Sequence, residues 1–253
     1  MRRAIAALSL LAIIALTGCG ENNASGSGGG PALKVSAAAS LKQALTVYGD
    51  DFAAARARFS FAGSDELAAQ IRAGARPDVF AAANAKLPDA LYADGLVERP
   101  VAFARNRLVL AVPAKTTKIR GLGDLARDGM TVAMGAPSVP VGSYTRTVLA
   151  GLPTAQRRAI LDNVRSNEPD VAGVVGKVTQ GAVDAGFVYV TDVKAAGGRL
   201  RAIALPAQLN PEVVYKAAVV TGSAHVQQSR AFVRGLLDGA GRRALDSAGF
   251  GRP

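Results

Sequence analysis

The feature that most constrains this chain is a regular alternation of short apolar runs and amphipathic helical patterns from Leu33 onward. The strand-like runs are Leu33–Ala37, Arg58–Ala62, Asp78–Ala82, Leu108–Val112, Thr131–Met134, Ala185–Val190, Leu200–Leu205 and Tyr215–Val220. Helical patterns lie between them, at Leu41–Ala57, Asp65–Ala73, Ala85–Asp94, Leu122–Arg127, Ser143–Leu149, Thr154–Asn163, Val171–Thr179, Asp192–Ala196 and Gln227–Ala248. This alternation predicts an α/β fold in which the sheets are mostly parallel.

Two places in the pattern indicate that the chain crosses between lobes. The apolar run Leu108–Val112 is flanked by charged residues and a proline, and a second crossing is expected around Tyr215–Val220. We therefore expect lobe I to contain residues 33–104 and 221–253, and lobe II to contain residues 105–220. The last helical segment is expected to pack back on lobe I.

Composition and charge exclude several classes of protein. The net charge is +11, but the Lys and Arg residues are scattered, and their longest runs are pairs such as Arg157-Arg158. Scattered charge is typical of a solvated surface. Tryptophan is absent and aromatic residues make up only 5 % of the chain, so few side chains are available to stack on bases. We expect no nucleic-acid partner.

The supply of reactive side chains limits the chemistry further. One Cys and one His are too few for a structural zinc site, which needs about four such ligands. His225 lies in a polar loop without a motif, and Gly121-Leu122-Gly123 follows a charged segment rather than a buried strand, unlike a dinucleotide fingerprint. We expect no catalytic residues and no cofactor, and an exported enzyme is the less favoured alternative.

The N-terminal segment has the pattern of an export signal. Residues 1–18 carry two arginines directly after Met1 and continue as an apolar run too short to span a membrane. Leu16-Thr17-Gly18-Cys19 is similar to a lipobox, and Cys19 has no second cysteine to pair with. Residues 19–32 are rich in Gly and Ser and suit a flexible tether. We expect Cys19 to be lipidated and to anchor the exported domain to the outer side of the cytoplasmic membrane. The alternative location is the periplasm.

Four predicted helix starts share the same character, and the first two directly follow the ends of predicted strands. They are found at Ala37–Leu41, Phe61–Leu67, Pro137–Tyr144 and Glu168–Val171. A helix start presents free N–H groups and the positive end of the helix dipole, which together favour an anion. In open α/β folds such starts converge beyond the carboxyl ends of the strands. Ser40 by itself is most simply an N-cap, and only the combination suggests a ligand site.

The motifs at these positions resemble the substrate-binding proteins of bacterial molybdate ABC transporters. The matching segments occur in the family's order and cover nearly all of residues 33–253; they are Ala37–Leu41, Phe61–Ser64 with Leu67, Gln70 and Ile71, Gly74, Pro77–Phe80, Ala83-Asn84, Val139–Tyr144 and Phe187–Asp192. The resemblance implies a type II periplasmic-binding-protein-like fold with a ligand cleft between two lobes. It also implies that the protein is not an enzyme.

The resemblance assigns a role to each matched residue. Ser40 and Ser64 would donate from hydroxyl and backbone N–H groups in lobe I. Val141 and Val171 would donate backbone N–H groups in lobe II, and Tyr189 would donate its phenol. The alternative for Tyr189 is a half-buried strand aromatic with no ligand contact. The metal would be bound only as the molybdate oxyanion through these residues. The implied partners are molybdate or tungstate and an ABC transporter permease, and the protein would act as a monomer.

The charge of Asp65 bears on which anion the predicted site accepts. Asp65 follows Ser64, where an inward carboxylate would repel a dianion, although an acid in the first helical turn is favourable when it faces solvent. Another small anion, such as sulfate or phosphate, is the nearest alternative cargo. A site made only of donors disfavours phosphate, which is still partly protonated near pH 7. A ligand-sensing regulator is disfavoured by the export signal.

Overall fold

The computed structural model describes residues 30–253, so the predicted signal peptide (1–18), Cys19 and most of the predicted tether lie outside the described residues. The strands are β1 (Ala32–Ala38), β2 (Arg56–Ala62), β3 (Val79–Ala82), β4 (Val101–Asn106), β5 (Leu108–Pro113), β6 (Val132–Gly135), β7 (Val164–Glu168), β8 (Ala185–Tyr189), β9 (Leu200–Ala204) and β10 (Val213–Val219). The helices are α1 (Lys42–Asp50), α2 (Ser64–Arg72), α3 (Lys86–Ala93), α4 (Pro140–Ala150), α5 (Thr154–Asp162), α6 (Val171–Thr179), α7 (Val190–Ala195), α8 (Val226–Leu237) and α9 (Gly239–Ala248).

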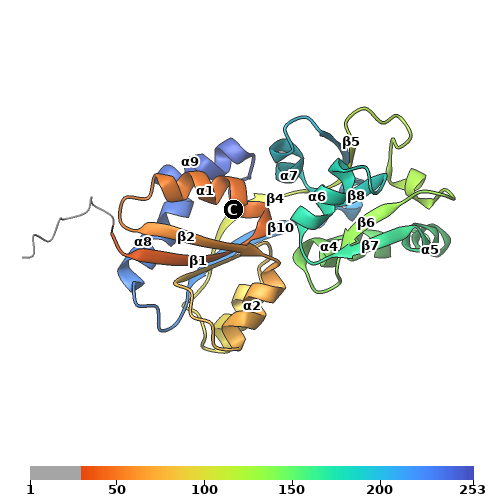
Figure 1. Cartoon of the computed structure of the whole chain (residues 1–253). Coiled ribbons are helices and arrows are strands. Elements are labelled where there is room, and N and C mark those ends of the chain that lie inside the picture. The colour runs from red at the N-terminus through yellow and green to blue at the C-terminus, as the bar shows by residue number, and fades with distance from the viewer. Residues whose placement is uncertain (1–29) are drawn as a thin grey trace, which may run out of the picture.

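These elements form two lobes, each built on a five-stranded sheet with helices packed against it (Figure 1). The strand order is β2-β1-β3-β10-β4 in lobe I and β7-β6-β8-β5-β9 in lobe II. In each sheet a single strand, β10 or β5, runs antiparallel to both neighbours, while the other described pairs are parallel. The predicted two-lobe α/β fold is therefore confirmed. Four of the five strands in each sheet run in the same direction, but the pairs made by β10 and β5 are antiparallel, so both sheets are mixed.

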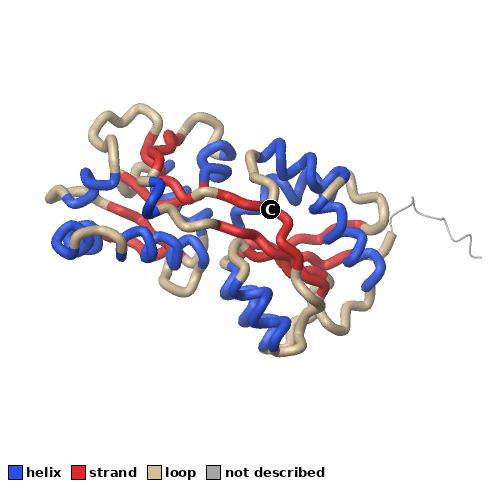
Figure 2. The backbone as a smooth tube through the Cα atoms, turned by 180° about the vertical axis from the view of Figure 1, so that it is seen from behind, coloured by secondary structure: helices blue, strands red, loops and turns tan. Residues whose placement is uncertain are grey.

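The chain passes between the lobes twice, and the second passage lies earlier than expected (Figure 2). The first links β4 to β5 through Arg107, and the second runs from β9 to β10 through residues 205–212. Because β10 pairs with β3 and β4, it belongs to lobe I. The expected boundary of lobe II at residue 220 is corrected accordingly: β10 is apolar like the lobe II strands, and only its pairing reveals its lobe.

A continuous apolar core extends across both lobes. It contains buried residues from β1 and α1 in lobe I and from β5, β6 and β8 in lobe II. A smaller cluster, which includes Leu67, Ile71, Phe80 and Leu91, lies under α2 and α3. Helix α1 therefore packs on one face of the lobe I sheet, and α2 and α3 pack on the other. Burial of each large apolar side chain in these contacts contributes about 1.5–3 kcal/mol.

Several element boundaries differ from the sequence expectation. The first helix ends at Asp50 rather than Ala57, because Arg56–Ala62 pairs along its full length with β1. The last helical segment is two helices, since Asp238 has an extended backbone between α8 and α9. The predicted tether also ends sooner, because the Pro31 carbonyl already accepts the Arg56 N–H at 2.9 Å. None of the helices in residues 30–253 is long and apolar enough to span a bilayer.

Candidate anion-binding site

A small pocket lies between the lobes at the carboxyl ends of the strands. About 230 Å³ of space not filled by atoms lies in and at the mouth of the pocket, including the part open to solvent. Its walls are Ala38, Ala39, Ser40, Ala62, Gly63, Ser64 and Ala83 from lobe I, and Val139, Pro140, Val141, Asp170, Val171 and Tyr189 from lobe II. Small side chains dominate this lining, so a ligand in the pocket would lie close to backbone groups.

All five residues predicted to bind the ligand line this one pocket. Ser40 and Ser64 come from lobe I, while Val141, Val171 and Tyr189 come from lobe II. Their convergence follows from the sheet topology, because parallel strands bring their carboxyl ends to the same edge. Their contacts with a ligand remain a prediction.

Two helices of lobe II begin at the pocket. Helix α4 starts after Val139 with Pro140 in its first turn, and its first bonded N–H is that of Ser143. Helix α6 starts after Asp170, whose Oδ1 accepts the Gly173 N–H at 2.9 Å. In both helices the earlier N–H groups have no acceptor within the helix. The Val141 and Val171 amides are therefore available to an anion.

The Ser64 hydroxyl has a defined orientation. The Ala83 N–H donates to the Ser64 Oγ at 3.1 Å in a buried position. A backbone N–H can only donate, so the Ser64 oxygen is the acceptor and its own hydrogen remains free. Ser64 therefore presents a donor to the pocket.

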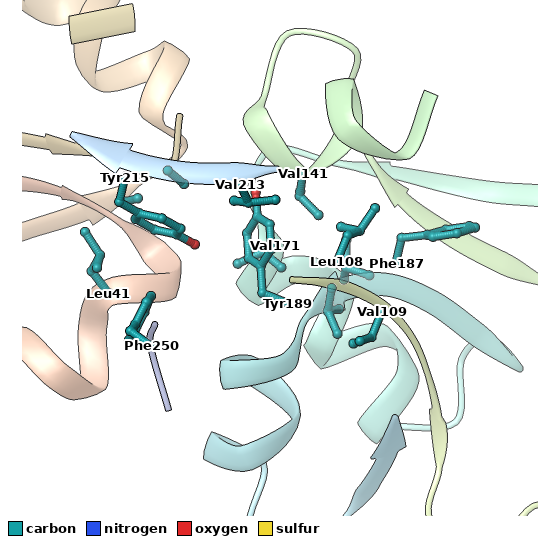
Figure 3. Packing of buried hydrophobic residues seen from close by; sticks show 14 of the residues in the cluster. Leu41, Leu108, Val109, Val141, Val171, Phe187, Tyr189, Val213, Tyr215 and Phe250 are labelled. Carbon is teal, nitrogen blue, oxygen red and sulfur yellow. The ribbon is translucent and has the colours of Figure 1, made fainter. Parts of the chain in front are cut away.

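Tyr189 is the most unusual group in the lining. Its side chain is only 1 % exposed, and within residues 30–253 no group hydrogen-bonds to its hydroxyl. Figure 3 shows the neighbouring Tyr215 directed toward Tyr189, and the two ring centroids are 6.0 Å apart. Burial, reinforced by Tyr215, raises the pKa of Tyr189 well above its usual value. The hydroxyl therefore keeps its proton and remains a donor.

The turn before α4 is held from behind by Arg146. Its Nη1 donates to the carbonyl oxygens of Gly135 and Gly142, each at 3.0 Å, and its Nη2 donates to Asn167 at 3.1 Å. Gly142 packs so closely that an added Cβ would lie 2.0 Å from the Ala136 carbonyl oxygen. This packing fixes the direction of the Val141 amide.

The Asp65 carboxylate neither points into the pocket nor faces solvent alone. It is partly exposed and does not line the pocket, but its Oδ1 is buried and has no hydrogen-bond partner among the described residues. Its Oδ1 would lie 2.8 Å from a Cβ added to Gly63. The carboxylate therefore sits beside the pocket wall rather than facing solvent alone.

Comparison with known proteins agrees with this architecture. The family model for bacterial extracellular solute-binding proteins matches residues 33–251. The chain belongs to this family. The molybdate-binding protein ModA of Mycobacterium tuberculosis is 36 % identical over 97 % of this chain and 96 % of that protein. The putative ABC transporter substrate-binding lipoprotein YvgL of Bacillus subtilis is 28 % identical over 96 % and 95 % of the two chains.

The solved structures agree on the fold. The periplasmic molybdate-binding protein of Azotobacter vinelandii matches with a TM-score of 0.79 at 24 % identity, covering 87 % of this chain and 99 % of that one. As a member of the extracellular solute-binding family, the protein binds a solute and is not an enzyme. The described residues contain no group of three or more His, Cys, Asp or Glu able to hold a metal ion.

Sequence reasoning missed a polar cluster behind the pocket of this solute-binding protein. The cluster consists of Asn106, Thr191, Asp192 and Tyr215, all buried. Tyr215 accepts or donates a hydrogen bond with Ser40 at 2.9 Å, and Asn106 contacts both Thr191 and Tyr215. Asn106 lies between two arginines and Thr191 is adjacent to Asp192, so no local pattern marks these residues as a buried cluster.

Asp192 predicts a measurable pH dependence. Burial raises the pKa of Asp192 to about 7, with Asp170 adding to the effect and the Tyr189 N–H bond opposing it. An aspartate in the unfolded chain titrates near 4, so between about pH 4 and 7 the folded state holds a proton that the unfolded state has lost. Stability is therefore expected to fall as pH rises through this window.

The Asp192→Asn variant should lose this dependence. The amide oxygen can still accept the Tyr189 N–H, while no charge develops on burial. We expect its melting temperature above pH 7 to exceed that of the parent protein by on the order of 5 °C, with little difference at pH 4. Thermal melting of the ligand-free domain from pH 4 to 8 measures this, with the exposed Asp128→Asn as control. Parallel pH profiles for Asp192→Asn and the parent protein would contradict the prediction.

Proposed function

We propose that this protein binds molybdate in the pocket between its lobes and delivers it to an ABC transporter permease. The observation that carries the proposal is the Tyr189 hydroxyl, a buried donor without a partner in residues 30–253 that belongs to the pocket lining. Leaving such a group unpaired costs about 1–3 kcal/mol. A ligand oxygen in the pocket would remove that cost.

Neutral donors suffice for a dianion in such a setting. Helix-start amides are already oriented by the fold, and hydrogen bonds to a charged acceptor are shorter and stronger than neutral ones. The Ser64 hydroxyl, the Val141 and Val171 amides and the Tyr189 phenol all offer hydrogens to the same small space. Molybdate and tungstate are tetrahedral dianions that present acceptors only.

Sulfate is the second candidate, because the same set of donors would satisfy it. The relatives favour molybdate: the M. tuberculosis protein, which is 36 % identical, is named a molybdate-binding protein. Phosphate is less suited, since near pH 7 it still carries a proton that needs an acceptor.

Isothermal titration calorimetry on residues 30–253 with molybdate, tungstate, sulfate and phosphate tests the proposal. We expect molybdate and tungstate to bind most tightly and phosphate to bind least. Sulfate binding as tightly as molybdate would move the assignment to the second candidate. If none of the four anions binds, the proposed function is wrong.

Tyr189→Phe separates a ligand donor from a structural aromatic. The variant removes a hydroxyl that would bond a charged ligand oxygen, so we expect molybdate affinity to fall by about 10–150-fold. The ligand-free protein should melt at the same or a higher temperature, because a buried unpaired group has been removed. Calorimetry and thermal melting measure the two effects, with the exposed Tyr92→Phe as control. Unchanged affinity would remove Tyr189 from the site.

Export and anchoring are part of the same proposal. YvgL, which is 28 % identical, is named a substrate-binding lipoprotein. We infer that Cys19 is lipidated, that the domain works as a monomer, and that the Gly/Ser-rich segment after Cys19 lets it reach the permease. Tungstate is expected to share the site.

Cys19→Ser should release the protein from the membrane. A hydroxyl cannot form the thioether that carries the lipid, so the variant should move from the membrane fraction to the soluble or secreted fraction. Cell fractionation with immunoblotting measures the distribution, with Ser27→Ala in the adjoining segment as control. An unchanged membrane fraction for Cys19→Ser would contradict the anchor.

A further inference from the structure

A chain of hydrogen bonds runs from the first crossing between the lobes to the pocket. Asn106, the last residue of β4, contacts the Tyr215 hydroxyl through Nδ2 at 3.3 Å. The Tyr215 hydroxyl lies 2.9 Å from the Ser40 Oγ, and Ser40 lines the pocket. Tyr215 is fully buried and Asn106 is 7 % exposed, so bulk water has little access to these bonds.

The direction of this chain is set at Asn106. The Arg107 N–H donates to the Asn106 Oδ1 at 2.9 Å, which identifies the opposite end of the amide as the NH₂ group. That group donates to the Thr191 Oγ1 at 2.8 Å and to the Tyr215 hydroxyl. The Tyr215 oxygen is therefore an acceptor toward Asn106.

The hydrogen bond between Tyr215 and Ser40 has its direction set in turn by the bond from Asn106 to Tyr215. The Tyr215 proton needs an acceptor, and the Ser40 Oγ is the one that the described residues provide. If Ser40 instead donated to Tyr215, the tyrosine proton would be buried without a partner, which is costly. Burial raises the pKa of Tyr215 well above its usual value, so that proton stays in place. Ser40 thus accepts from Tyr215 and turns its own hydrogen to the pocket.

We propose that Asn106 and Tyr215 are positioning residues that hold Ser40 as a donor, and so make the pocket select unprotonated over protonated oxyanions. The inference rests on the proposed function. Ser64 is oriented by a backbone N–H, which substitution does not alter. Ser40 is oriented by the side chains of Asn106 and Tyr215. Substituting either residue can therefore change whether the Ser40 hydroxyl donates to the ligand or accepts from it.

The first test is a double-mutant cycle between Tyr215→Phe and Ser40→Ala. Tyr215→Phe leaves the Ser40 oxygen without its donor, and we expect molybdate affinity to fall by about 2–10-fold. In the Ser40→Ala background the same substitution should have no further effect, because its target is gone. Tyr48→Phe, which removes a hydroxyl bonded to the Phe232 carbonyl in lobe I, is the matched control. Additive effects of Tyr215→Phe and Ser40→Ala would overturn the proposal.

The second test reverses the chain. In Asn106→Asp the carboxylate accepts the Tyr215 proton, Tyr215 accepts from Ser40, and Ser40 faces the pocket as an acceptor. We expect molybdate affinity to fall by about tenfold or more, and phosphate affinity to fall less or to rise, so that the preference for molybdate shrinks. Ser40→Ala should abolish this change of preference. An equal loss for both anions, or one that persists without Ser40, would indicate a structural effect and overturn the proposal.

The two levels of inference fail separately. If the parent protein binds no molybdate by calorimetry, the proposed function fails. If the parent protein binds molybdate and Tyr215→Phe is additive with Ser40→Ala, the function stands and the positioning role fails. Thermal melting of each variant establishes that it is folded, and the Tyr215→Phe cycle decides the question if Asn106→Asp is not.

Discussion

Replacing Gly63 with alanine is expected to weaken molybdate binding by about 5–150-fold while leaving each lobe folded. A Cβ at Gly63 in lobe I would lie 2.5 Å from the Pro169 carbonyl oxygen and 3.0 Å from Val139 Cγ1, both in lobe II. It would also lie 2.8 Å from the Asp65 Oδ1 within lobe I, but that atom ends a side chain that can rotate away. The Pro169 oxygen belongs to the backbone and cannot swing away. Overpacking of this kind costs about 1–3 kcal/mol, and here the cost is imposed on the contact between the lobes.

The backbone at Gly63 makes this variant a clean test. Its φ of −59° and ψ of 137° are open to any residue, so alanine introduces no backbone strain. Calorimetry measures affinity and small-angle scattering measures how far the lobes close. Gly176→Ala in α6 is the matched control, because an added methyl there meets nothing within 4 Å. Unchanged affinity in Gly63→Ala would show that lobe contact at this point is not needed for binding.

Replacing Gly142 with alanine is expected to damage both the fold and the site. The added Cβ would lie 2.0 Å from the Ala136 carbonyl oxygen and 2.3 Å from the Gly135 carbonyl oxygen, within lobe II itself. The turn before α4 must then move, which breaks its bonds with Arg146 and turns the Val141 amide away from the pocket. We expect a loss of about 3 kcal/mol or more in the free energy of unfolding.

Thermal melting and calorimetry separate the two glycines. Gly142→Ala should lower the melting temperature of the ligand-free domain by about 6–12 °C and also weaken binding. Gly63→Ala should weaken binding without a comparable loss of stability, and Gly176→Ala should do neither. A Gly142→Ala variant that melts like the parent protein would show that the turn can relax, contrary to its packing against two backbone carbonyls.

The two strands that the sequence pattern did not predict both lie at sheet edges, although two other edge strands, β2 and β9, were predicted. β4 and β7 are each the last strand of their sheet, and β7 alternates exposed with half-buried residues. An edge strand has one neighbour and often a solvated face, so it needs no apolar run. For the same reason β2, whose residues are mostly polar or small, was in part read as helix.

The residues that line the candidate site could be predicted from the sequence, whereas the residues behind them that orient Ser40 could not. Ser40, Ser64, Val141 and Val171 each stand at a helix start that local turn residues reveal, and they line one pocket as expected. Tyr215 and Asn106 carry no local signal of this kind. Tyr215 is 175 residues from the Ser40 hydroxyl it contacts, so only the folded chain brings them together.

The sequence by itself determined the α/β alternation, the existence of two lobes and the helix starts that gather at their junction, because these depend on periodicity and turn chemistry within short segments. Only the tertiary structure decided that β10 belongs to lobe I, that the buried Tyr189 hydroxyl has no partner among residues 30–253, and that Tyr215 contacts the Ser40 hydroxyl. Each of these depends on contacts between residues that are far apart in the sequence. Such contacts are determined by how the folded chain packs and not by any local sequence pattern.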